Sequence, residues 1–317
     1  MMLDKQTKAL LDSFAEQSTD IHDIEISVET SREGARAMFL GLAGEVDSQC
    51  TSDDMVIEHG GTEVKLRCYR PAQASPGLTP AVVFIHGGGW SLGDVECYDS
   101  LVRDLCQQSG AIFFSVDYAL APENKFPCAL HQVIGVVNWL KANHQQFDIA
   151  PEKIALMGDS AGGNLALAAA NKLHQQQTDL LANLYLIYPV VDSFSPHDTY
   201  ASRLKYGDGN FLLTKEAIKD TCDWYLQQDQ SAKDPDVSPL FINDMKHLPA
   251  TSMVLAGCDP LYDEGLLLAN KMKQAGILKT LTCYENTIHA FFSFAVLDVC
   301  RLARQQLANQ LRHDLFH

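Results

Sequence analysis

The sequence has no apolar run long enough to cross a membrane and no cluster of lysines and arginines. A transmembrane helix needs about 20 consecutive apolar residues, so the first absence argues against a membrane protein. The chain carries 24 basic and 40 acidic residues, which gives a net charge of −16. Nucleic acids and anionic membrane surfaces are bound through clustered positive charge, so we expect neither as a partner.

Paired cysteines and metal-binding motifs are also missing. The nine cysteines are odd in number, scattered and never spaced as C-x-x-C, a pattern typical of reduced thiols in a reducing compartment. Asp4, Lys5 and Gln6 stand near the N-terminus in place of an apolar signal stretch, and we therefore expect a cytoplasmic protein. No spacing of histidines, cysteines and carboxylates suits a metal and no glycine loop suits a phosphate, so no metal and no cofactor are expected.

Hydrophobic residues make up 46% of the 317 residues, enough to fill one large core. Short strand-like runs alternate with helical segments, which predicts a doubly wound, mainly parallel α/β sheet in a single domain, 1–317. These runs are 81–85, 111–116, 153–157, 184–188, 252–256 and 279–284. Ahead of them, two more strand-like runs flank a pair of glycines and predict an antiparallel hairpin; they are 55–58 and 63–69.

Helices are expected outside the sheet as well. The first would carry its apolar residues on one face, namely Leu3, Leu10, Leu11 and Phe14. A second would begin at a capping box formed by Thr30 and Glu33. A third is predicted at 215–227, within a polar stretch that follows Pro189.

Two glycine-rich segments each follow a strand-like run: HGGGW at 86–90 and GDSAGG at 158–163. Ser160 would lie on a sharp turn between a strand and a helix, where a Cβ atom at Gly158 or Gly162 would clash. A serine on such a turn is a nucleophile, and the earlier glycine run supplies backbone N–H groups to an oxyanion hole. Flexible turns are the alternative interpretation, but two such segments in this order, both after strands, favour the catalytic one.

A serine nucleophile needs a histidine base and an acid that orients the histidine, and both should follow later strands. Asp259 follows the run 252–256, and His289 comes shortly after the run 279–284. Three unrelated folds carry a triad of serine, histidine and aspartate, each with its own order of the three residues along the chain. The order here, serine then aspartate then histidine, matches one of these folds and differs from the orders in the two protease folds.

Three other residues compete for these roles. Asp263 and Glu264 lie close to Asp259, but they follow a proline and are expected to begin a helix, where acidic residues favour the positive end of the dipole. His86 opens the glycine run, and we expect its ring to fix that loop by hydrogen bonding.

These motifs resemble those of the hormone-sensitive-lipase-like family of bacterial carboxylesterases. The resemblance covers Val56 to about Leu311 and also includes DYALAPE at 117–123 with the following Phe126-Pro127, DPLYDEG at 259–265 and HAF at 289–291. It implies an α/β-hydrolase fold with a helical cap of about 1–50 and 191–237 over a catalytic core of about 51–190 and 238–317. Ala119 departs from the family, which often has arginine there, at a position that is not catalytic.

The resemblance also implies roles and a reaction. The triad would consist of Ser160 as nucleophile, Asp259 as acid and His289 as base. The oxyanion hole would use the backbone N–H groups of Gly88, Gly89 and Ala161. The reaction would be hydrolysis of short- to medium-chain acyl esters through an acyl-enzyme. The partner would then be a small-molecule ester, and the sequence is compatible with a homodimer.

Two alternatives remain open. An amidase or formamidase could use the same triad, because acyl transfer to water does not depend on whether oxygen or nitrogen leaves. A non-catalytic small-molecule receptor on this fold would keep the pocket but could lose the base. The presence of Ser160, Asp259 and His289 together argues against the receptor.

Overall fold

The computed structural model of the chain describes residues 3–17, 27–45, 49–73, 77–176 and 181–317. Within them, eight strands form one sheet in the order β1-β2-β4-β3-β5-β6-β7-β8. Strands β1 (Thr51–His59) and β2 (Thr62–Arg70) form the predicted hairpin, and β2 pairs antiparallel with β4 (Ile112–Asp117). The remaining pairs are parallel and involve β3 (Thr79–Ile85), β5 (Ile149–Asp159), β6 (Asn183–Ile187), β7 (Ala250–Cys258) and β8 (Leu278–Ile288).

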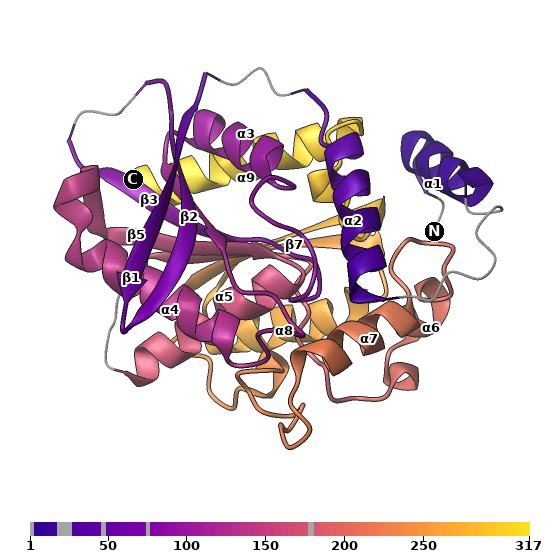
Figure 1. Cartoon of the computed structure of the whole chain (residues 1–317). Coiled ribbons are helices and arrows are strands. Elements are labelled where there is room, and N and C mark those ends of the chain that lie inside the picture. Colours follow the sequence, from indigo (N-terminus) through magenta and orange to yellow (C-terminus); the bar gives the residue numbers. More distant parts are fainter. Residues whose placement is uncertain (1–2, 18–26, 46–48, 74–76, 177–180) are drawn as a thin grey trace.

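Helices cover both faces of the sheet (Figure 1). On one face lie α3 (Asp99–Ser109) and α9 (Asp298–Phe316); on the other lie α4 (Cys128–Ala142), α5 (Ala161–Gln175) and α8 (Tyr262–Ala275). Every residue of β3 is buried, as expected for a central parallel strand with apolar packing on both sides. The predicted doubly wound α/β architecture is confirmed.

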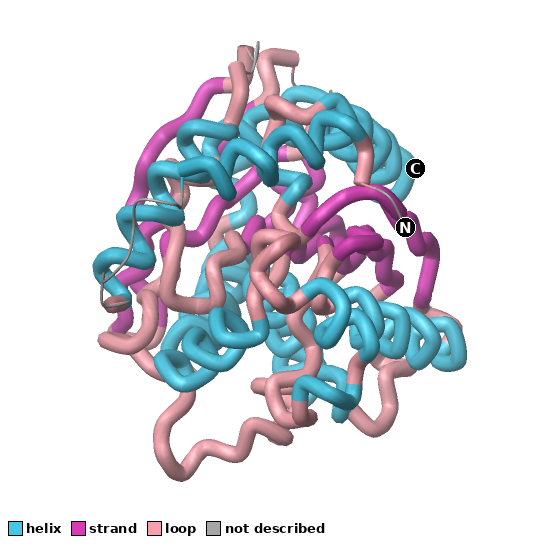
Figure 2. Tube along the Cα trace, turned by 90° about the vertical axis from the view of Figure 1, so that its right-hand side faces the viewer, coloured by secondary structure: helices cyan, strands magenta, loops and turns pink. Residues whose placement is uncertain are grey.

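Four further helices lie beyond the carboxyl ends of the parallel strands (Figure 1). They are α1 (Lys5–Gln17), α2 (Val28–Leu42), α6 (Ala201–Tyr206) and α7 (Lys215–Tyr225). Figure 2 faces this end of the molecule and shows helices and long loops in front of the strands. Asp4, just ahead of α1, lies beside the edge strand β8, where its N–H donates to the Asn286 carbonyl (3.1 Å). No helix in the described ranges is long and apolar enough to span a membrane.

The structure corrects two details of the sequence prediction. Helix α2 is capped by Ser27, whose hydroxyl accepts from the Thr30 N–H (3.2 Å), so Thr30 is the third helical residue and Glu33 takes no part in the capping box. Strand β8 also continues past residue 284 to Ile288. An edge strand has one side open to solvent and tolerates polar residues, which is why the polar segment 285–287 did not end it.

Candidate active site

Ser160 occupies the turn between β5 and α5, with φ +52° and ψ −117°. The turn requires glycine on both sides. A Cβ atom added to Gly158 would lie 2.3 Å from the backbone of Gly162, and one added to Gly162 would lie 1.9 Å from the Ile85 carbonyl oxygen. The Ser160 N–H donates to the Ile187 carbonyl on β6 (2.9 Å). The sequence thus forms the predicted strand–turn–helix and holds the hydroxyl at the end of the sheet.

The three predicted triad residues are joined by hydrogen bonds. His289 Nε2 lies 3.0 Å from Ser160 Oγ, and His289 Nδ1 lies 2.7 Å from Asp259 Oδ2. Asp259 directly follows β7 and His289 directly follows β8, two adjacent parallel strands, so their side chains meet at one edge. The other Asp259 oxygen accepts from the Leu261 N–H (2.8 Å). This arrangement fixes the orientation of the imidazole ring toward the serine.

The surroundings of His289 raise the pKa of its imidazole ring above the ordinary histidine value. Burial lowers the pKa of His289, but the negative charge of Asp259, its hydrogen bond and the nearby Asp159 and Glu264 raise it, and the net shift is upward. A raised pKa increases the affinity of the ring for the proton that a base must accept.

The glycine run forms a tight turn beside Ser160. Gly88 has φ +108°, and a Cβ there would lie 2.2 Å from the Leu92 carbonyl oxygen. The N–H groups of Ser91 and Leu92 donate to the Gly88 carbonyl (3.1 and 2.8 Å) and close the turn. Gly88 and Gly89 line the same cavity as Ser160, while Ala161 is the first residue of α5 and follows the serine directly.

Asp159 is a site residue whose position the sequence analysis did not anticipate. Its carboxylate accepts from the Gly87 N–H (2.8 Å) and from the Tyr98 hydroxyl (3.3 Å), so it ties the glycine run to the nucleophile turn. Burial raises the pKa of Asp159 to about 7, although the Gly87 N–H and the charge of His289 oppose that rise. Its place next to the serine was the only signal in the sequence.

His86 has the structural role predicted for it. Its Nδ1 lies 2.7 Å from the Gly87 carbonyl oxygen, and its ring stacks on Tyr118 with centroids 4.3 Å apart. The ring is fully buried, and burial lowers its pKa. His86 therefore fixes the loop as a neutral side chain.

A cavity of about 230 Å³ lies above Ser160 and His289. Its wall is mostly apolar and includes Met38 and Phe39 of α2, Leu212 and Leu213, and Ala217 and Ile218 of α7. These residues belong to 1–50 and 191–237, so both segments predicted to form a cap contribute to the wall. A neutral, apolar group is the ligand that such a wall accommodates best.

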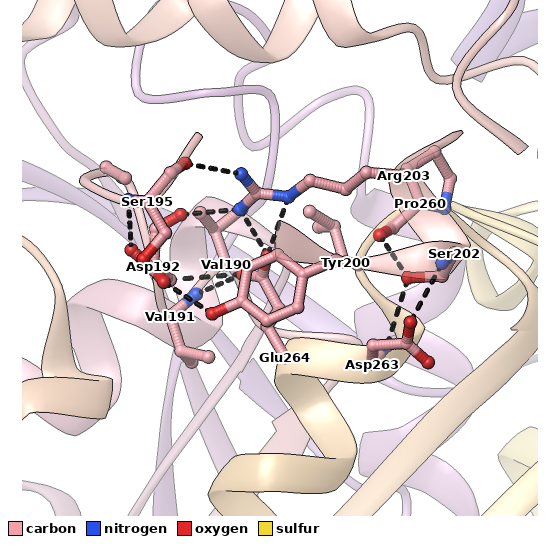
Figure 3. Close-up of polar contacts among 12 residues, drawn as sticks. Val190, Val191, Asp192, Ser195, Tyr200, Ser202, Arg203, Pro260, Asp263 and Glu264 are labelled. Atoms are coloured by element: carbon pink, nitrogen blue, oxygen red, sulfur yellow. Dashed lines mark hydrogen bonds and ion pairs between the residues drawn. The ribbon is translucent and has the colours of Figure 1, made fainter. Parts of the chain in front are cut away.

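A second buried polar cluster is centred on Arg203 and Glu264 (Figure 3). Glu264, in the first turn of α8 as predicted, is fully buried and pairs with Arg203 of α6. Its carboxylate also accepts from the N–H groups of Val191 (2.8 Å) and Asp192 (3.2 Å). Arg203 donates to the carbonyls of Asp192 (2.5 Å) and Ser195 (3.3 Å). The cluster fixes the chain that leaves β6.

The same cluster reaches the segment that carries Asp259. The Ser202 hydroxyl donates to the Pro260 carbonyl (2.8 Å), and the Ser202 N–H donates to Asp263 (2.8 Å). Asp263 thus pairs with Ser202 and Glu264 with Arg203 (Figure 3), whereas His289 is hydrogen-bonded to Asp259.

The sheet order, the nucleophile turn and the hydrogen-bonded serine, histidine and aspartate together define an α/β-hydrolase. Residues 82–293 match the family model described as alpha/beta hydrolase fold, and the chain belongs to that family. The resemblance to hormone-sensitive-lipase-like esterases, noted in the sequence, is confirmed.

Relatives and solved structures agree. The chain is 32% identical over 265 residues to ethyl acetate hydrolase of Pseudomonas putida. This alignment covers 82% of this chain and 80% of that protein. A hyperthermophilic esterase from Pyrobaculum calidifontis superposes with a TM-score of 0.90 at 33% identity, covering 99% of both chains. An ester hydrolase from the metagenome of Lake Arreo, solved with a bipyridine phosphonate derivative, gives 0.94 at 29% identity and covers 100% of both.

Proposed function

We propose that the protein is a serine carboxylesterase that hydrolyses short- to medium-chain acyl esters of small molecules. The observation that carries this proposal is the chain of hydrogen bonds from Ser160 through His289 to Asp259 at the base of an apolar cavity. The ester-hydrolysing relatives support the choice of substrate class.

In the proposed mechanism, Ser160 Oγ attacks the ester carbonyl carbon while His289 Nε2 takes the hydroxyl proton. The Asp259 carboxylate stabilises the imidazolium that forms. His289 then gives the proton to the leaving alcohol, and a serine-bound acyl group remains. Water attacks this acyl-enzyme with His289 again as base, which releases the carboxylic acid and restores Ser160.

The backbone N–H groups of Gly88, Gly89 and Ala161 are proposed to bind the tetrahedral oxyanion. Removing one donor from a comparable site costs about 3 kcal/mol in transition-state free energy. The tight glycine turn and the hydrogen bond between Gly87 and Asp159 support this role, because donors that are already in place need no reorganisation during the reaction.

Chain length tests the proposal. Each methylene buried against an apolar wall contributes about 0.8 kcal/mol, so kcat/KM should rise with acyl length until the cavity is full. On p-nitrophenyl esters we expect efficient cleavage from two to about eight acyl carbons and a steep fall by about twelve, a limit carried over from family resemblance. Values that keep rising to sixteen carbons would overturn the esterase in favour of a lipase.

The amidase and the receptor give different results in parallel assays. An ester and its matched amide, offered at equal concentration, distinguish the esterase from an amidase or formamidase. Binding of an ester without turnover would support a receptor. We expect turnover of the ester and little of the amide, because an amine is the poorer leaving group.

Organisation and location are also proposed. One α/β-hydrolase domain, with a cap of about 1–50 and 191–237, is supported by the wall that both segments provide for the cavity. A reducing, cytoplasmic location is supported by the odd number and scattered spacing of the nine cysteines. A homodimer is a further proposal, and sedimentation of the purified chain tests it.

A further inference from the structure

Helix α7 lies directly on the glycine run. Gly89 has φ +57°, and a Cβ added to it would lie 2.4 Å from the Thr221 Cγ2 methyl group. The methyl therefore occupies the space that only a glycine leaves free. Its position is set by the Thr221 hydroxyl, which donates to the carbonyls of Ala217 (2.9 Å) and Ile218 (3.1 Å) within the helix and so restricts χ1.

The next residue of the run is fixed by a second contact with α7. The Trp90 ring stacks on Tyr225, with centroids 4.5 Å apart and planes 3° from parallel. Both side chains are almost fully buried, and Tyr225 also packs edge-on against Phe126 (5.7 Å). Trp90 itself has φ +58°, a conformation that side-chain-bearing residues rarely adopt. The stack thus supports a backbone conformation that would otherwise be unfavourable.

The C-terminal turn of α7 is itself anchored to the core. Lys125 Nζ donates to the carbonyls of Asp223 (3.1 Å), Trp224 (2.6 Å) and Leu226 (2.9 Å). The Phe126 N–H donates to the Tyr225 carbonyl (2.8 Å). Because α7 is fixed at this end, its contacts with Gly89 and Trp90 restrain the loop rather than move with it.

We infer that α7 holds the glycine run in the conformation that presents its N–H groups to the oxyanion, with Thr221 and Tyr225 as positioning residues. Three consecutive residues, Gly88, Gly89 and Trp90, have positive φ, and such a loop has many alternatives when nothing packs on it. Donors act well only when they are preorganised. This inference rests on the proposed esterase function and adds two residues that act through the loop: Tyr225 through its stack on Trp90, and Thr221, which also lines the cavity, through its contact with Gly89.

Two matched pairs of variants test it. Thr221→Ser removes the methyl group and keeps the hydroxyl, whereas Thr221→Val keeps a methyl on Gly89 and removes the hydroxyl. Tyr225→Leu removes the ring, whereas Tyr225→Phe keeps it and loses no hydrogen bond, because the Tyr225 hydroxyl has no partner within the described residues. kcat and KM are measured on p-nitrophenyl acetate and butyrate, and folding is checked by thermal unfolding.

We expect Thr221→Ser and Tyr225→Leu to lower kcat about tenfold, less than the roughly 100- to 1,000-fold loss from deleting a donor. The loss should be equal for acetate and butyrate, because every ester presents the same carbonyl to the loop. KM should change less than about twofold, since ground-state binding is not the target. Thr221→Val and Tyr225→Phe should retain most of the wild-type kcat.

Other outcomes separate the alternatives. A change in KM that differs between acetate and butyrate would mean that these residues only shape the cavity, and would overturn the inference. Wild-type kcat in both Thr221→Ser and Tyr225→Leu would also overturn it. If Tyr225→Leu fails to fold, the two Thr221 variants decide the question. An unmodified protein that cleaves neither ester would contradict the proposed function itself, whereas the Thr221 and Tyr225 variants test only the role of α7.

Discussion

Two buried polar clusters take their acidic residues from one short segment, 259–264, yet they differ in what they can do. Asp259 and Glu264 are both almost fully buried, and each accepts a backbone N–H as well as its side-chain partner. Asp259 is paired with His289, which can gain and lose a proton near neutral pH. Glu264 is paired with Arg203, whose charge is permanent.

The surroundings of the two clusters also make the first reactive and the second structural. His289 reaches Ser160 and the cavity, so a proton can pass to a bound ligand. Arg203 donates hydrogen bonds to Glu264 and to two backbone carbonyls (Figure 3). Burial raises the pKa of Glu264 and the charge of Arg203 opposes that rise, so the shifted pKa of a buried carboxyl group does not by itself mark a reactive site. A titrating partner that opens onto a cavity distinguishes a reactive cluster from a structural one.

The largest expected effect breaks the reactive cluster. Ser160→Ala should lower kcat for p-nitrophenyl acetate by about 10⁶-fold, because it removes the hydroxyl that is hydrogen-bonded to His289. The thermal unfolding midpoint should stay near that of the wild type, since the change removes one oxygen. A variant with more than a few per cent of wild-type kcat would contradict the assignment of Ser160.

Asp259→Asn tests the orientation of the histidine. The amide fits the same space but favours the wrong ring tautomer, and we expect kcat to fall about 10⁴-fold. Glu264→Gln is the matched control in the other cluster: it should cost stability and leave the kcat of the folded protein within a few-fold of wild type. If the two substitutions lowered kcat equally, the distinction between the clusters would be lost.

Arg203→Met tests the structural cluster. It leaves a buried carboxylate without its counter-charge, and breaking such a pair costs about 3–5 kcal/mol in the free energy of unfolding. Urea unfolding measures this loss. The double variant Arg203→Met with Glu264→Gln removes both charges, keeps an acceptor for the Val191 and Asp192 N–H groups, and should recover part of the stability. An unchanged midpoint in the single variant would show that the pair contributes little.

The smallest effect concerns pH. The pKa of His289 is raised, and the protonated ring cannot act as base, so the acid limb of kcat/KM should have its midpoint above the ordinary histidine value of about 6.5. Asp259→Asn removes a charge and should move the titration of His289 to lower pH, which proton NMR of the ring can follow. A wild-type midpoint below about 6 would contradict the electrostatic account.

The sequence predicts the reactive cluster better than the structural one. Ser160 is found because its turn demands glycines at fixed spacing, and Asp259 and His289 because parallel strands bring their carboxyl ends together. Glu264 looks like an ordinary acidic residue in a first helical turn, and nothing local shows that Arg203, 61 positions away, is buried against it. The contact of Thr221 with Gly89 joins residues that are even further apart in the sequence.

The ends of helices are also hard to predict from the sequence, because long-range packing helps to set them. Ser27 and Thr30 satisfy each other at the start of α2, while the spacing of Thr30 and Glu33 suggested a start three residues later. Propensity favours several neighbouring starts, and packing of the helix on the core selects one.

Covalent labelling of Ser160 tests the central claim most directly. The protein is incubated with a p-nitrophenyl alkylphosphonate, and the intact mass and the peptide that carries the adduct are determined. The account predicts one adduct per chain, located on Ser160, release of one equivalent of p-nitrophenol, and no adduct on Ser160→Ala. Stoichiometric labelling of Ser160→Ala, or an adduct at another residue of the wild type, would contradict it.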